Sequence, residues 1–419
     1  MTVLSLVLAG RAEPPPPSAQ ERAGAPTRVD RTLVCPGGLP SARVESGAAG
    51  EAGQPGTRVQ EASLPEHGEA TEVVTEAGRA AGAFATQVAR GEDWLAAVPC
   101  PEPRQEWWFV GVGGGQAHRS EVLVSNPREG DAVVDVEVLG PRGRVEAPGL
   151  DGMFVPAGTT TRLDLREVSP SSGDLAVRVT TSRGLVSVVA ADSQVPDLIG
   201  DRLREWVTPQ PAATRRVTLT GLPDDAEDAT ALVANPGEVE ALVEVRAIGS
   251  RGTFTPSGTG PLRVGPGEVR PLDIDAVFDG EPVAVSLEST DPVAATVRSV
   301  VEGDLTHAGA PARSADGAVL GIPERTRAEL RVSSPRVGGR VRVTPYTAAG
   351  RPLRTRTVSI DAGTTAGLRL PDRARSVALR TSSPRIVAGL VLASSDGVAS
   401  AVFEAAQAAS RAPGVRQAS

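Results

Sequence analysis

The strongest constraint on the fold is a set of turn landmarks that occurs three times along the chain. The only two asparagines, Asn126 and Asn235, lie 109 residues apart (235 − 126) in the matching segments VLVSNP and ALVANP, and RVSSP places Ser334 at the same position 99 residues later (334 − 235). A period near 100 residues is too long for a solenoid repeat and has the size of a domain. The chain is therefore predicted to contain three domains of one kind.

Each copy carries a second landmark, a turn glycine that leads into a strand. Gly158, Gly267 and Gly363 follow the Asn or Ser position by 32, 32 and 29 residues. Pro127 and Pro236 cannot donate a ladder hydrogen bond and push the preceding residue into an extended conformation, so a strand is expected to end there. The asparagine side chain can bond to the backbone two residues on, and serine does the same more weakly. All of these positions are interpreted as structural turns.

Short strands are predicted between these landmarks. Residues 134–138 alternate valine with Asp and Glu, which is typical of a strand with one buried face and one wet face. Each copy has about six or seven such segments, with turn signals every 8–12 residues, and ends in two strands interpreted as a hairpin. We therefore predict an all-β fold with three tandem Ig-like antiparallel β-sandwich domains. Aromatic residues make up only 3% of the chain, so the cores must be aliphatic.

The predicted boundaries follow the repeats. Ile199, Leu203 and Trp206 have helical spacing, which predicts a short amphipathic helix that covers a sandwich edge. The N-terminal section is expected to be β-rich or mixed, and both ends of the chain to be disordered. The segments are a stub and Pro-rich linker at 1–28, the N-terminal region at 29–103, sandwiches at 104–208, 209–311 and 312–406, and a tail at 407–419.

The two cysteines, Cys35 and Cys100, both follow a short apolar stretch and precede a proline. Their matched contexts favour one disulfide formed in an oxidising compartment. Two unpaired buried thiols are the alternative. A zinc site is disfavoured, because two cysteines without nearby histidines cannot supply four ligands.

Residues 1–10 are apolar but shorter than the roughly 20 residues that a membrane span needs. A signal peptide would also need a basic leader, which this stretch does not have. We interpret it as the remainder of an export or anchor helix, with a short disordered tail as the alternative.

The types of charged residue exclude several chemistries. All 43 Lys-plus-Arg residues are arginine, which excludes Walker A phosphate loops, Schiff-base catalysis and lysine-based kinase sites. The net charge of −8 argues against a nucleic-acid partner. The three histidines lack metal-ligand spacing, and no GxSxG segment accompanies them. We therefore expect no enzyme activity, no cofactor and no metal.

The candidate binding residues are Trp107, Trp108 and His118, which flank or adjoin a glycine-rich segment at 111–115. Adjacent strand residues point to opposite faces, so one tryptophan is expected in the core and the other outside. An outward Trp108 could stack on a sugar ring, unless the N-terminal region covers it. The glycine-rich segment is interpreted as a flexible hairpin loop, and the acidic segment at 222–229 as a solvated turn.

The Cys-Pro-Gly segment at Cys35, the tryptophan strand, the strands that end in Asn-Pro and the PAGTT-type turns resemble one family of proteins. This is the domain-of-unknown-function family 5719, whose members are exported actinobacterial proteins. The resemblance covers roughly residues 30–405. It implies an extracytoplasmic location, secreted or membrane-anchored through an N-terminal segment that is shortened here. It implies no catalytic residues.

Three hypotheses about function follow. The first is a non-enzymatic cell-envelope protein whose repeats act as a spacer or protein-interaction platform, with an envelope protein or wall polymer as partner and the membrane reached only through the N-terminal anchor. The second is a carbohydrate- or wall-polymer-binding module that uses Trp108 or the loops at 111–119 and 222–229. The third, a hydrolase, is disfavoured by the missing motifs, although a triad can be assembled from distant loops.

Overall fold

The computed structural model describes residues 31–403 except 51–53, 65–69, 76–81, 171–172, 196–201, 211 and 312–313. The predicted stub and linker, the tail and Ile199 lie outside the described residues. Within them the fold is almost entirely β, which confirms the predicted fold class. The named helices are the single turn α1 (Leu165–Val168) and the 3-10 helix η3 (Asp275–Val277). No helix of the described part is long and apolar enough to span a bilayer.

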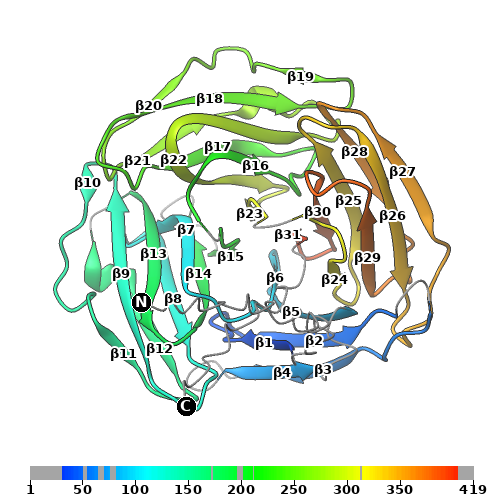
Figure 1. Ribbon diagram of the computed structural model, residues 1–419, viewed down its shortest axis with the longest axis horizontal. Coiled ribbons are helices and arrows are strands. Elements are labelled where there is room, and N and C mark those ends of the chain that lie inside the picture. Colours follow the sequence, from blue (N-terminus) through cyan, green and yellow to red (C-terminus); the bar gives the residue numbers. More distant parts are fainter. Residues whose placement is uncertain are drawn as a thin grey trace, which may run out of the picture.

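The strands form four consecutive units arranged around a common centre (Figure 1). Unit 1 covers residues 31–99, unit 2 residues 106–207, unit 3 residues 214–308 and unit 4 residues 319–402. Unit 1 lies at the bottom of Figure 1 in blue, and the others follow through the left and the top to the right. Units 1 and 4 are in contact, so the ring is closed.

The bounds of the strands are as follows. Unit 1 contains β1 (Arg31–Cys35), β2 (Arg43–Ala48), β3 (Gln60–Ser63), β4 (Thr71–Thr75), β5 (Ala83–Arg90) and β6 (Leu95–Pro99). Unit 2 contains β7 (Glu106–Gly113), β8 (His118–Ser125), β9 (Ala132–Gly140), β10 (Gly143–Arg144), β11 (Met153–Val155), β12 (Thr160–Asp164), β13 (Asp174–Arg183), β14 (Ser187–Gln194) and β15 (Leu203–Val207). Unit 3 contains β16 (Thr214–Leu219), β17 (Glu227–Ala234), β18 (Ala241–Ile248), β19 (Thr253–Phe254), β20 (Leu262–Val264), β21 (Val269–Asp273), β22 (Ala284–Val301) and β23 (Asp304–Ala308). Unit 4 contains β24 (Val319–Gly321), β25 (Arg327–Ser334), β26 (Gly339–Tyr346), β27 (Arg356–Ile360), β28 (Thr364–Arg369), β29 (Ser376–Thr381), β30 (Val387–Ala393) and β31 (Val398–Val402).

One sheet recurs in all four units with the same strand order, and we call it the central sheet. Its four copies are β3-β2-β5-β6, β12-β8-β14-β15, β21-β17-β22-β23 and β28-β25-β30-β31. The last strands, β6, β15, β23 and β31, lie innermost and contact one another around the centre (Figure 1). The N-terminal region therefore contributes a fourth copy of this sheet, which the search for three repeats did not detect.

Each unit has a second sheet, the flanking sheet, which packs against its central sheet. The flanking sheets are β1-β4, β10-β9-β13-β7, β19-β18-β22-β16 and β27-β26-β29-β24. In unit 3 one long strand, β22, runs through both sheets: residues 284–289 pair with β18 and residues 294–301 pair with β17 or β23.

The strand pairs predicted as closing hairpins are not hairpins. β13 pairs with β7 and β9, whereas β14 pairs with β8 and β15, and β29 and β30 are divided between two sheets in the same way. Alternation and a turn signal identify two strands and a change of direction, but they do not say which strands pair. Here the turn takes the chain from the flanking sheet to the central sheet.

The predicted amphipathic helix around Trp206 is wrong. Residues 203–207 form β15, which pairs with β14. Leu203, Trp206 and Val207 are all buried, because an innermost strand is covered on both faces. A strand that is buried on both faces does not alternate apolar and polar residues. Three apolar residues then have helical spacing by chance, and the pattern is mistaken for an amphipathic helix.

The hydrophobic cores are shared between units, so the expectation of separate sandwich cores is revised. Val88 and Leu95 of unit 1 belong to the core of unit 4. Leu123 of unit 2 packs into unit 1, and Leu232 of unit 3 packs against Trp108 of unit 2. Each central sheet therefore packs on both faces, one against its own flanking sheet and the other against the neighbouring unit.

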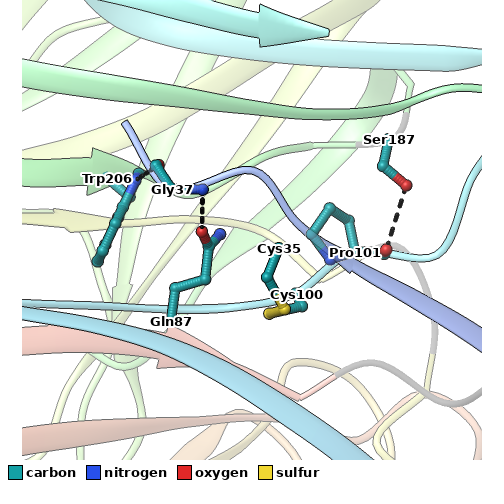
Figure 2. The surroundings of a disulfide bond; sticks show 7 residues. All are labelled: Cys35, Gly37, Gln87, Cys100, Pro101, Ser187 and Trp206. Atoms are coloured by element: carbon teal, nitrogen blue, oxygen red, sulfur yellow. Dashed lines mark hydrogen bonds between the residues drawn. A yellow bond between two sulfur atoms is a disulfide. The ribbon is translucent and has the colours of Figure 1, made fainter. Parts of the chain in front are cut away.

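The predicted disulfide between Cys35 and Cys100 is confirmed. It joins the end of β1 to the residue after β6, where unit 1 meets unit 2 (Figure 2). Gly37 donates its backbone N–H to Gln87 Oε1 at 2.6 Å and accepts a hydrogen bond from Trp206 Nε1 at 2.9 Å. The segment after the disulfide is thus held by side chains of both units.

The two asparagines organise equivalent turns. Asn126 Oδ1 accepts from Arg128 N at 3.1 Å, and its Nδ2 donates to Val155 O at 3.1 Å. Asn235 repeats both bonds, from the backbone N two residues on and to the Val264 carbonyl, at 2.9 Å each. The side chain therefore fixes its own turn and ties it to the strand 29 residues later.

The turn glycines bond to the same positions. The N–H groups of Gly158, Gly267 and Gly363 donate to the carbonyls of Asn126, Asn235 and Ser334 at 2.9, 2.9 and 2.7 Å. The three glycines have φ of +68°, +66° and +75°, a left-handed conformation that glycine adopts without the steric cost of a Cβ. The two landmarks of each repeat are thus the two halves of one backbone junction.

Replacing Asn235 by alanine is expected to lower the free energy of unfolding by about 1–3 kcal/mol, because it leaves buried carbonyls without donors. Ser334→Ala is the matched control in unit 4, where a single hydroxyl donates to the Val337 carbonyl. This variant should lose less free energy of unfolding than Asn235→Ala. Urea denaturation of both variants measures the difference. An equal loss in the two would contradict the greater anchoring role of the asparagine.

Candidate functional site

The two tryptophans are both buried. Trp107 lies in the core of unit 2, and its Nε1 donates to the Val186 carbonyl at 3.0 Å. Trp108 is 1% exposed and packs against Leu232 and Ala294 of unit 3. It points away from the core of its own unit, as expected, but unit 3 covers it rather than the N-terminal region. The ring of Trp108 is therefore not available to stack on a sugar.

The glycine-rich segment is not the flexible loop predicted from its composition. Gly111 and Gly113 lie within β7. A Cβ on Gly111 would lie 2.6 Å from Leu232 Cδ1, and one on Gly113 would lie 2.4 Å from His118 Cγ. Both glycines permit close approach, one to unit 3 and the other to the imidazole.

His118 belongs to a cluster of ionisable side chains at the boundary of units 2 and 3. Its Nε2 lies 3.0 Å from Asp192 Oδ1, and its Nδ1 lies 3.6 Å from Asp174 Oδ1. His307 of β23 reaches the other oxygen of Asp192, with Nε2 3.1 Å from Oδ2. Arg298 of β22 pairs with Asp174, with Nη2 3.3 Å from Oδ2. Two carboxylates of unit 2 thus bind two bases of unit 3.

Burial and charge give these groups different protonation states. Burial raises the pKa of Asp192, but the charge of His118 and hydrogen bonds from both histidines bring it well below its ordinary value. Burial lowers the pKa of His118, but Asp192 raises it more, so its net pKa lies above 6.5. Burial dominates at His307, whose pKa falls below 6.5. The cluster therefore favours the ionised form of Asp192 and the protonated form of His118, and disfavours the protonated form of His307.

Ser120 completes the cluster without becoming a nucleophile. Its hydroxyl donates to the Asp192 carboxylate and accepts from Gly113 N at 2.8 Å. The side chain is fully buried. A serine hydrolase needs the hydroxyl to be bonded to an imidazole and open to substrate, so this Ser, His and Asp set does not have that geometry.

Two further buried carboxylates lie on the innermost strands, and sequence analysis did not single them out. Asp304 Oδ2 accepts backbone N–H groups from Leu95 of β6 at 2.9 Å and Val398 of β31 at 2.8 Å. Glu205 Oε1 accepts from Trp206 N at 2.8 Å and from Ala97 N of β6 at 3.3 Å. Both carboxylates therefore connect strands of different units. The available signal was slight: each acidic residue directly precedes one large apolar residue, Trp206 or Leu305, in a short strand.

Burial shifts the pKa of both carboxylates upward. It raises the pKa of Glu205 well above its ordinary value, with a smaller upward effect from Asp304. It raises the pKa of Asp304 to about 7, against backbone hydrogen bonds that lower it. Both groups thus favour the neutral form at the ring centre.

The acidic segment at 222–229 lies at the boundary of units 3 and 4. Asp224 accepts a hydrogen bond from Arg331 at 2.6 Å, and the Arg331 side chain is only 2% exposed. Burial raises the pKa of Asp224, and Arg331 lowers it in part. Asp225, Glu227 and Asp228 are exposed, as a solvated turn requires. Within the described ranges, no three His, Cys, Asp or Glu side chains are grouped so that they could hold a metal ion.

The raised pKa of Asp304 predicts a pH-dependent stability. Between pH 4 and pH 7 the folded protein retains a proton that the unfolded chain has released, so the free energy of unfolding falls as the pH rises. Asp304→Asn has no such proton. The stability of wild type relative to this variant should fall across that window by up to about 4 kcal/mol. Urea denaturation at several pH values measures it, and a constant or rising difference would contradict the assignment.

Comparison with known proteins identifies the family of this chain. No curated protein sequence matches the chain. A family of unknown function (DUF5719) matches residues 48–371, which include strands of all four units and more than half of the 419 residues. This chain therefore belongs to the DUF5719 family.

Proposed function

We propose that this protein is a non-enzymatic cell-envelope protein, exported from the cytoplasm, whose closed ring is a rigid platform or spacer for binding partners. The observation that carries the proposal is the placement of its ionisable groups. Asp192, His307, Glu205 and Asp304 are all buried and bonded across unit boundaries. Shifted pKa values often mark catalytic clefts, but structural networks also produce them, and these groups join units rather than line a cleft.

The disulfide supports the extracytoplasmic part of the proposal. Cys35 and Cys100 are both buried, and bonds of this kind form and persist in oxidising compartments. A platform also requires units that keep fixed positions. Shared cores and ion pairs across the boundaries of units 2, 3 and 4 hold these units in fixed positions.

The alternative function, binding of a wall polymer, is supported by the surface of unit 4 and not by Trp108. Trp108 is covered, so stacking on a neutral sugar has no support there. Unit 4 instead exposes many arginines, which suit an anionic polymer. A hydrolase is not supported by the geometry around Ser120.

The proposal is tested by in-cell cross-linking together with a turnover screen. Cross-linking in intact cells should recover partners outside the cytoplasm, and activated esters and glycosides should not be turned over by the purified protein. His118→Ala and Ser120→Ala variants serve as controls in the screen. Turnover that either variant abolishes would overturn the non-enzymatic proposal, and recovery of only cytoplasmic partners would overturn the location.

A further inference from the structure

The charge of this acidic protein is distributed very unevenly among the units. Unit 4 (residues 319–402) contains 14 arginines and 5 acidic residues, a net charge of +9 (14 − 5). Unit 3 (residues 214–308) contains 7 arginines and 16 acidic residues, a net charge of −9 (7 − 16). The whole chain has a net charge of −8. Unit 4 is thus a concentrated cationic region on an otherwise anionic molecule.

Most arginines of unit 4 have no counter-charge in the described structure. Four of the 14 form ion pairs with described carboxylates. They are Arg331, Arg336, Arg369 and Arg375. The other ten are exposed and form no ion pair with any described carboxylate. They are Arg325, Arg327, Arg340, Arg342, Arg351, Arg354, Arg356, Arg373, Arg380 and Arg385.

The flanking sheet of unit 4 brings three of these arginines together on one face. Arg342 of β26 and Arg380 of β29 are direct cross-strand partners. Arg340 lies two residues before Arg342 and therefore on the same face. Thr357 and Ser359 of β27 lie opposite Arg342 and Arg340, so small polar groups continue this face. We call this surface the arginine face.

An arginine pair of this kind costs free energy unless an anion neutralises it. Like charges directly opposite on adjacent strands destabilise a sheet. The guanidinium group offers a fork of N–H donors that matches phosphate oxygens, and it stays charged at any physiological pH. The fixed spacing of paired strands, roughly 5 Å between partners, suits a chain of closely spaced anions.

We propose that the arginine face binds a linear polymer with phosphate groups along its backbone. This inference deepens the platform role proposed above by giving the class of ligand. Protein–protein interfaces have apolar centres depleted of charge. In the described part of unit 4, Val337 is the one large apolar residue that is exposed. Surfaces that bind single-stranded nucleic acid add exposed aromatic rings for base stacking, and Tyr346 of this unit is buried. Backbone phosphates alone match what the face offers.

The test uses the full-length protein and long-chain inorganic polyphosphate as the probe. Immobilised polyphosphate should bind the wild type with an affinity that falls steeply with salt, because bound arginines release counterions. The R340Q/R342Q/R380Q variant should bind at least about tenfold more weakly, with a logarithmic salt slope reduced by about 2. These side chains are exposed and their like charges repel, so the variant should keep or raise the thermal unfolding midpoint.

The matched control is R128Q/R142Q/R183Q, which removes the same charge from exposed, unpaired arginines of unit 2. It should keep wild-type affinity and salt slope. No binding by wild type, or equal weakening in both variants, would overturn the inference. So would arginine-face-dependent binding to anionic phospholipid vesicles, or self-association, without binding to polyphosphate. Release of phosphate from the bound probe would instead contradict the non-enzymatic proposal while the binding site stands.

Discussion

The structure depends on a sheet that is buried on both faces and repeated four times. No central sheet can bury both of its faces within its own unit, because only one face meets the flanking sheet. The other face needs the neighbouring unit, and the fourth neighbour is supplied by residues near the start of the chain. Asp304 shows the consequence at the centre of the ring, where one carboxylate oxygen accepts N–H groups from β6 and β31. Strands from opposite ends of the described chain are thus joined through unit 3.

Units 1 and 4 are joined by buried polar contacts, as are the other neighbouring units. Glu45 of β2 pairs with Arg375 at 2.8 Å, and both side chains are largely buried. The Tyr346 hydroxyl donates to the Gly50 carbonyl at 2.8 Å. Removing one member of such a buried pair leaves a charge or a polar group without a partner, which is strongly destabilising. The polar groups at the boundaries therefore specify how units meet, while shared aliphatic cores supply the bulk of the burial.

Sequence patterns could predict what depends on local backbone chemistry. The Asn-Pro turns and the turn glycines follow from residues whose own conformational limits require them. The strand segments follow from alternation, and the disulfide from the matched contexts of the two cysteines. The fourth copy was missed because unit 1 lacks an Asn-Pro landmark, so its strands β2, β5 and β6 had no marker to align. The partners of β13 and β14 could not be read from alternation, and β15 was mistaken for a helix because burial on both faces removes alternation.

The candidate site was harder to predict for a related reason. Trp108 and His118 were singled out by residue type, but their roles depend on unit 3, more than 90 residues later in the chain. Asp192 lies 74 residues from His118 and 115 residues from His307 in the sequence, so only the folded ring brings the three side chains together. The arginine face differs: its excess charge is visible in the sequence, but only the strand register shows that Arg342 and Arg380 are neighbours.

The central claim is that four units close into one cooperative ring, and native-state hydrogen exchange of the intact protein tests it most directly. Peptides covering β6, β15, β23 and β31 should show the highest protection, with opening free energies that agree with one another and with that of global unfolding. Exchange of β6 at a much lower free energy, while the other three strands stay protected, would show that the N-terminal unit does not complete the ring.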